Sequence, residues 1–133
     1  MKKTIQLIGL LVLVATFSTY AGNNAPVKVV KDKDVQVYYF HATARCVTCK
    51  AVEKVTQEAL KEYYSEKVVF TSINREKDKN NPLIKKHKVS GQTLLVVKGK
   101  KVVNLTTGAF LNARKKPEKF KELIKSTIDP MLK

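Results

Sequence analysis

The pattern of apolar and polar positions changes along the chain. Residues 5–17 form an almost unbroken apolar run behind Lys2 and Lys3, and small or polar residues follow up to Ala21. From residue 35 onward, apolar residues occur in short blocks separated by charged ones, which is typical of a folded domain. We therefore expect residues 1–21 to be a separate segment, residues 22–34 a linker or loose first strand, and residues 35–133 the domain.

Blocks rich in β-branched and aromatic residues predict four strands. They are residues 35–40 (VQVYYF), 67–73 (KVVFTSI), 92–97 (QTLLVV) and 101–105 (KVVNL). Because only residues 98–100 separate the last two blocks, we expect these strands to form an antiparallel hairpin.

Helical spacing predicts three helices between and after these strands. Residues 46–64 place Val52, Val55 and Ala59 on one face, residues 82–88 begin with a proline, and residues 117–128 carry a last apolar stripe. Residues 108–116 are expected to be a loop. The resulting order β-α-β-α-β-β-α predicts an α/β fold, in which a central mixed sheet of four to five strands is flanked by helices on both faces.

Residues 1–21 have the features of a secretory signal peptide. The lysines precede the apolar run, and Thr19 and Ala21 occupy the small-residue positions before a cleavage point. An uncleaved anchor is the alternative, but the run is shorter than the roughly 20 apolar residues of a membrane span. We therefore expect an exported protein, most simply periplasmic, with its cysteines in an oxidising compartment.

Composition narrows the functional classes. The 133 residues suit one domain, the 44% hydrophobic content excludes a disordered chain, and the 2 cysteines exclude a disulfide framework or a four-cysteine zinc site. The net charge of +15 is spread over residues 85–88, 98–101 and 114–121 without interleaved aromatic residues. We therefore expect no nucleic-acid partner, and only weak attraction to acidic surfaces.

The two cysteines form the motif Cys46-Val47-Thr48-Cys49, which follows a predicted strand and opens a predicted helix. Cysteines three positions apart on a first helical turn bring their sulfurs within bonding reach. The helix N-terminus and the neighbouring Arg45 favour the thiolate, so we expect the pKa of Cys46 to lie below the usual value of about 8.5. Cys46 is therefore the expected nucleophile, and the more buried Cys49 the resolving cysteine.

From about residue 35 to residue 128, the chain resembles the thioredoxin-like family. The resemblance rests on the strand VYYF, the motif CVTCK, the hairpin TLLVVKGKKVV with the preceding Val89-Ser90-Gly91, and the last helix. It implies a thioredoxin-like fold and thiol-disulfide exchange with thiol or disulfide proteins or small thiols. It further implies a redox partner that recycles the cysteine pair and no cofactor or metal, and we expect a monomer.

The chain departs from the family pattern both within the cysteine motif and next to it. Arg45 stands where the family has Trp, Val47-Thr48 replaces Gly-Pro, and the first strand lacks the buried acid of many thioredoxins. The inner residues of the motif influence the reduction potential strongly, so reductase, oxidant and isomerase remain open.

Gln92, directly before Thr93, takes the position of the family's cis-proline. Because a cis bond before a residue other than proline costs about 2.5–4 kcal/mol, we expect a trans Gly91–Gln92 bond. The backbone there would still face Cys46 and could bond an extended substrate.

Other interpretations of the same residues remain. His41 could lie near Cys46 and support the thiolate, or be an ordinary polar loop residue. A redox-inactive binding protein with a structural disulfide is one alternative, although closing so short a loop stabilises little. A copper carrier using Cys46, Cys49 and His41 is the less favoured alternative.

Overall fold

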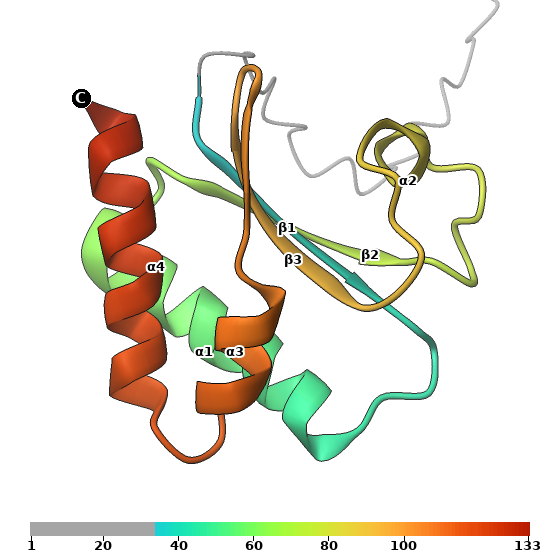
Figure 1. The fold of residues 1–133 in the computed structure, drawn as a ribbon, viewed down its shortest axis with the longest axis horizontal. Helices are drawn as coiled ribbons and strands as arrows, with labels where there is room; N and C mark the ends of the chain where they lie inside the picture. Colours follow the sequence, from blue (N-terminus) through green and yellow to red (C-terminus); the bar gives the residue numbers. More distant parts are fainter. Residues whose placement is uncertain (1–33) are drawn as a thin grey trace, which may run out of the picture.

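A four-stranded sheet lies at the centre of the computed structural model, which describes residues 34–133 (Figure 1). The predicted signal peptide and residues 22–33 of the predicted linker lie outside the described residues. The strands are β1 (Gln36–His41), β2 (Val69–Asn74), β3 (Thr93–Lys98) and β4 (Lys101–Asn104). The helices are α1 (Val47–Tyr64), α2 (Pro82–Lys86), α3 (Thr106–Asn112) and α4 (Pro117–Leu132). Among these helices, none is long and apolar enough to cross a membrane.

The strands follow the order β2-β1-β3-β4 across the sheet. β1 and β2 are parallel and connected through α1, whereas β3 is antiparallel to both β1 and β4. This mixed sheet with its parallel crossover and terminal hairpin is a thioredoxin-like α/β fold, as the sequence predicted. The pairing of Phe40 with Thr93 brings the end of β1 beside the beginning of β3.

Both faces of the sheet are covered, which explains why β1 is apolar at successive positions. Val37 and Tyr39 pack in the cluster shared with α1, α3 and α4. Tyr38 and Phe40 point to the opposite face and pack in the cluster that Leu83 of α2 joins. Successive residues of a strand point to opposite faces, so an inner strand with helices on both sides needs apolar residues throughout.

The helix α3 is absent from the predicted order, because part of it falls in the expected loop of residues 108–116. Its first turn is held by Asn104, whose Oδ1 accepts hydrogen bonds from both the backbone N–H and the hydroxyl of Thr106, at 2.9 and 2.6 Å. Leu105, Ala109 and Ala113 are buried at a helical spacing of four. Burial of these apolar side chains against the rest of the fold therefore outweighs the weak helix propensity of the threonines and Gly108.

The last helix extends beyond the predicted end at residue 128. Its buried stripe continues from Ile124 and Ile128 to Met131, which supports a further turn despite Pro130. The Lys98 ammonium donates a hydrogen bond to the backbone oxygen of Met131. A cation at this end of a helix satisfies a free carbonyl and opposes the negative end of the helix dipole.

We predict that Ala109→Leu destabilises the domain by about 1–3 kcal/mol, because Ala109 is 0% exposed and the added carbons would overpack α3 against its neighbours. Chemical denaturation followed by circular dichroism measures the loss. Thr107→Leu, on an exposed position of the same helix, should change stability by no more than about 0.5 kcal/mol. Equal effects of the two substitutions would show that α3 does not pack as described.

Candidate active site

The loop before the cysteine motif is anchored to the end of β2 and to the residues that follow it. The backbone N–H of Thr43 donates to Glu76 Oε2 at 2.9 Å, and the amide nitrogen of Asn74 donates to the Thr43 hydroxyl at 3.2 Å. The hydrogen bonds from Thr43 hold the pKa of Glu76 below its usual value. Residues before Cys46 are thus tied to a different part of the sheet.

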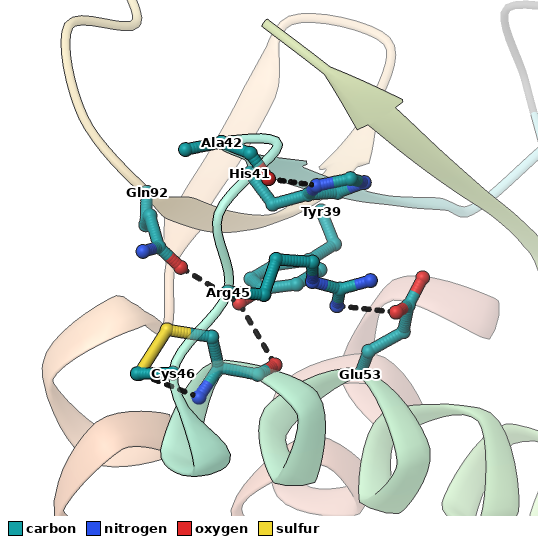
Figure 2. The surroundings of a disulfide bond; sticks show 8 residues. Tyr39, His41, Ala42, Arg45, Cys46, Glu53 and Gln92 are labelled. Carbon is teal, nitrogen blue, oxygen red and sulfur yellow. Dashed lines mark hydrogen bonds and ion pairs between the residues drawn. A yellow bond between two sulfur atoms is a disulfide. The ribbon is translucent and has the colours of Figure 1, made fainter.

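Cys46 caps the N-terminus of α1 with its sulfur (Figure 2). The backbone N–H of Cys49 donates to Cys46 Sγ at 3.1 Å, and the side chain of Cys46 is exposed. Cys49 is only 1% exposed, whereas Val47 between the cysteines is 69% exposed. The two cysteines form a disulfide across a Cα–Cα distance of 5.1 Å, which joins an exposed residue to a buried one.

Tyr39 connects three parts of this site from within the core (Figure 2). Its hydroxyl lies 3.0 Å from the carbonyl oxygen of Cys49 and 3.1 Å from the amide Oε1 of Gln92. A phenol has one proton to donate, so the Tyr39 hydroxyl shares it between these two oxygens. Tyr39 thus joins β1 to the first turn of α1 and to the residue before β3.

The environment of Tyr39 keeps its hydroxyl protonated. Burial raises the pKa of Tyr39, and this effect outweighs the opposing influence of the Arg45 charge. The Arg45 guanidinium lies over the Tyr39 ring, 5.7 Å from its centroid, in a cation–π contact. Tyr39 therefore acts at this site as a fixed neutral hydrogen-bonding group.

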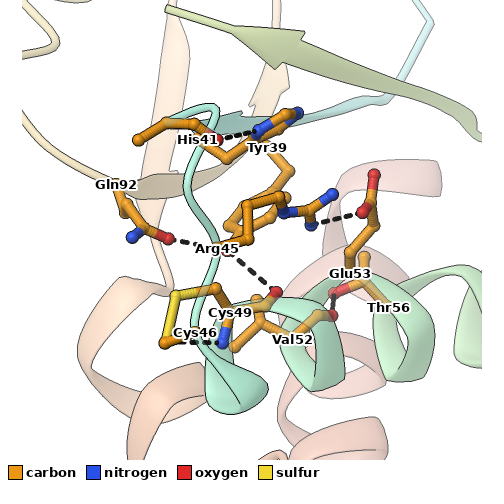
Figure 3. Close-up of polar contacts among 10 residues, drawn as sticks. Tyr39, His41, Arg45, Cys46, Cys49, Val52, Glu53, Thr56 and Gln92 are labelled. Carbon is orange, nitrogen blue, oxygen red and sulfur yellow. Dashed lines mark hydrogen bonds and ion pairs between the residues drawn. A yellow bond between two sulfur atoms is a disulfide. The ribbon is translucent and has the colours of Figure 1, made fainter.

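Arg45 is paired with Glu53, which lies one helical turn after Cys49 (Figure 3). Burial alone would raise the pKa of Glu53, but hydrogen bonds from Ser72 and Arg45 and the Arg45 charge lower it overall. The side chains of Arg45 and Glu53 are 18% and 19% exposed. The positive charge expected to support the Cys46 thiolate is therefore offset in part by a neighbouring carboxylate.

His41 is the last residue of β1 rather than the first residue of the loop, and it is 9% exposed. Its Nδ1 donates to the carbonyl oxygen of Ala42 at 2.8 Å, and its ring centroid lies 5.8 Å from that of Tyr39. The expectation of a polar loop histidine is thus wrong in its placement, because the pairing of β1 with β2 extends to His41. The structure gives this histidine a packing contact with Tyr39.

Gly91, Gln92 and Thr93 lead into β3 beside the motif. No peptide bond among the described residues is cis, so the Gly91–Gln92 bond is trans, as predicted. The Thr93 hydroxyl donates to the carbonyl oxygen of Gly91 at 3.1 Å, and Arg75 donates to the carbonyl oxygen of Ser90 at 3.0 Å. The segment before β3 is thus held from within and from the loop after β2.

Tyr39 and Glu53 were not identified as site residues from the sequence. The strand VYYF predicted a buried Tyr39, and a buried tyrosine hydroxyl requires a partner, which is the signal that could have drawn attention to it. Glu53 lies four residues after Cys49 and so shares its side of α1, but its pairing with Arg45 depends on the path of the loop.

Metal-ligating side chains do not gather at the motif. Within residues 34–133, no three His, Cys, Asp or Glu side chains lie close enough to hold a metal ion together. The Nδ1 atom of His41 is engaged by Ala42. The cysteine pair therefore has no third protein ligand in the described part of the chain.

The basic segments are not uniformly solvated. Lys121 pairs with Glu62 at 2.9 Å, and the His87 ring packs 5.7 Å from the ring of Tyr38. Burial and the nearby Lys86 lower the pKa of His87. The His87 side chain is therefore partly buried, because its ring lies against Tyr38 of β1.

Comparisons with known proteins found similarity to solved structures at low sequence identity. No protein-family model and no curated protein matches the sequence. Among solved structures, a malarial protein is 23% identical, with a TM-score of 0.41, over 59% of this chain and 93% of that one. Thioredoxin from Trypanosoma brucei brucei is 19% identical, with a TM-score of 0.43, over 70% of this chain and 77% of that one.

We predict that the interaction between Arg45 and Glu53 stabilises the folded domain by about 1 kcal/mol at neutral pH. A double-mutant cycle of Arg45→Ala and Glu53→Ala measures this coupling free energy. The folded-state pKa of Glu53 lies below its usual value of 4.5, so the contribution is present above that pH. It is lost as the pH falls through the lowered pKa.

The exposed pair Lys54–Glu58, at 3.8 Å, is the matched control and should couple by less than about 0.5 kcal/mol. Equal coupling in the two pairs, or coupling between Arg45 and Glu53 that does not change on acidification, would contradict the partial burial described.

Proposed function

We propose that this chain is an exported thiol-disulfide oxidoreductase that exchanges its Cys46–Cys49 disulfide with thiol or disulfide proteins or with small thiols. The observation that carries the proposal is the asymmetry of the pair. Cys46 is exposed and accepts a hydrogen bond from the Cys49 N–H at the start of α1, while Cys49 is 1% exposed beneath it.

This geometry supports different roles for the two sulfurs. After reduction, a negative charge on Cys46 would meet a backbone donor and the positive end of the α1 dipole. The first turn of α1 contains no acidic residue to oppose that charge. Cys49 is shielded from solvent and so from outside disulfides, which suits a residue that attacks only the adjacent Cys46.

The exchange proceeds in two balanced steps. The Cys46 thiolate attacks one sulfur of a substrate disulfide, forms a mixed disulfide and releases the other substrate sulfur as a thiolate. The Cys49 thiolate then attacks Cys46 Sγ, forms the Cys46–Cys49 disulfide and releases the second substrate thiolate. Two electrons pass from the protein to the substrate, and the reverse sequence oxidises a substrate dithiol.

The proposal also includes an oxidising compartment and a redox partner. Residues 1–21 would direct the chain to an oxidising compartment, most simply the periplasm, where a redox-partner protein with its own dithiol or disulfide would recycle the pair. The reduction potential of the pair would decide the direction. A value near −270 mV favours a reductase, and a value near −120 mV favours an oxidant.

We predict that Cys49→Ser traps a mixed disulfide on Cys46, because the resolving thiol is missing. Incubation with oxidised glutathione followed by intact-mass spectrometry should show one glutathione adduct. The rate of Cys46 alkylation by iodoacetamide should rise with pH around a midpoint below about 8.5.

The matched control is Cys46→Ser, which leaves only the buried Cys49 and should form little adduct. An unreactive Cys46 at neutral pH, with no adduct in Cys49→Ser, would contradict an oxidoreductase. That result would favour the alternative of a redox-inactive binding protein whose disulfide is structural.

A further inference from the structure

A cavity of about 530 Å³ lies between α2 and the turn of the β3–β4 hairpin. Its lining residues are Lys86, His87, Gly99, Lys100 and Val102. Two basic segments that are separate in the sequence therefore meet around one cavity, and none of the described residues that line it is acidic. A cavity of this volume is large enough to hold a small organic molecule.

The wall formed by α2 is fixed against the sheet. Asn81 Oδ1 accepts a hydrogen bond from the backbone N–H of Leu83 at 3.0 Å, and Leu83 packs against the cluster that contains Tyr38. The backbone N–H of His87 donates to the Leu83 carbonyl oxygen at 3.0 Å. The apolar side of α2 is thus buried, which leaves Lys86 exposed at the cavity.

The β3–β4 hairpin supplies the other wall. Gly99 has a φ of 56°, a backbone conformation that favours glycine, at the short turn between the two strands. Val102 pairs with Val97, so the two side chains lie on the same face of the sheet, the face that α2 covers. Lys98 is bound to the end of α4, whereas Lys100 is exposed at the cavity.

His87 adds a neutral ring to the cavity. Burial and the nearby Lys86 lower its pKa, so the imidazole carries little charge at pH 7 and the positive charge comes from Lys86 and Lys100. The Nε2 atom of His87 is buried and has no hydrogen-bond partner among residues 34–133. A ligand oxygen that reaches this atom would supply a hydrogen bond that the protein itself does not.

We propose that this cavity binds an organic phosphate monoester, with its phosphate between the ammonium groups of Lys86 and Lys100 and its organic part against Val102. A phosphate monoester carries a charge of about −1.5 to −2 at pH 7, which two lysines match. Lysine binds phosphate as a point charge on a flexible chain, so two side chains from separate walls can close on one phosphate.

The organic part of the ligand has an apolar surface to cover. Val102 is 46% exposed, and removing an apolar side chain from water is favourable. The cavity is also separate from the cysteine site, because α2 packs on the face of Tyr38 and Phe40, whereas α1 packs on the opposite face with Tyr39. Binding there is therefore independent of thiol-disulfide exchange.

Titration of the protein with phenyl phosphate, followed by NMR, locates the binding site. The chain has 2 histidines, of which His87 lines the cavity and His41 lies beside Tyr39 at the cysteine site. The ring signals of His87 should shift as phenyl phosphate binds, and those of His41 should stay unchanged. Unchanged His87 signals up to about 10 mM phenyl phosphate, or shifts at His41 alone, would overturn the proposal.

Two double variants separate the cavity from the general positive charge. Lys86→Ala with Lys100→Ala should weaken phenyl phosphate binding by at least about tenfold, because both charged contacts are lost. Lys85→Ala with Lys101→Ala removes the same charge from exposed neighbouring positions outside the cavity lining, and should weaken binding by less than about twofold. Equal weakening in the two double variants would overturn the proposal, because the surface charge alone would then explain the attraction.

A phosphate monoester can be a soluble compound or the headgroup of phosphatidic acid. Sedimentation with vesicles of phosphatidylcholine and phosphatidic acid distinguishes the two sources. Vesicle binding that phenyl phosphate competes away, and that only the Lys86→Ala, Lys100→Ala variant loses, supports the cavity and assigns it to the headgroup. Binding of phenyl phosphate without vesicle binding supports the cavity and assigns it to a soluble ester. Vesicle binding without phenyl phosphate binding, lost equally in both double variants, would overturn the proposal.

Discussion

The arrangement of the candidate site depends on the hydroxyl of one buried residue, Tyr39. Burial of a phenol without a hydrogen bond would be costly. The Tyr39 hydroxyl avoids this cost through its hydrogen bonds to the Cys49 carbonyl and the Gln92 amide. Because Tyr39 lies on the inner strand β1, paired with both β2 and β3, these contacts hold the first turn of α1 and the segment before β3 at a defined separation. The position of the disulfide relative to Gln92 follows from this constraint.

The disulfide takes no part in the ion pair of the site, which joins Arg45 to Glu53. The chain carries a net charge of +15, but the cation nearest in sequence to Cys46 is bound to Glu53. The exposed sulfur instead meets the backbone N–H of Cys49 and the positive end of α1. Backbone donors do not titrate, so this local preference for a thiolate does not depend on the protonation state of a neighbouring side chain.

Different parts of the structure differed in how predictable they were. The strand around Tyr39, the helix after Cys46 and the β3–β4 hairpin were predicted because each has strong local periodicity or a short turn. The helix α3 was missed because its 7 residues include Gly108 and neighbouring threonines, whose propensities favour a loop. Ala109 in this helix and Ala113 at its end are small, so they give a weak apolar signal in the sequence although both are buried.

The α/β order, the start of a helix at the cysteine pair and the trans bond before Gln92 could all be predicted from the sequence. These features follow from local spacing, from the geometry of a helical turn and from the cost of a cis bond. The pairing of Arg45 with Glu53 and the contacts of Tyr39 with Cys49 and Gln92, in contrast, depend on how the chain folds. Those contacts link separate segments, and their partners are chosen by the path of the loop, the register of β1 with β3 and the need to satisfy a buried hydroxyl.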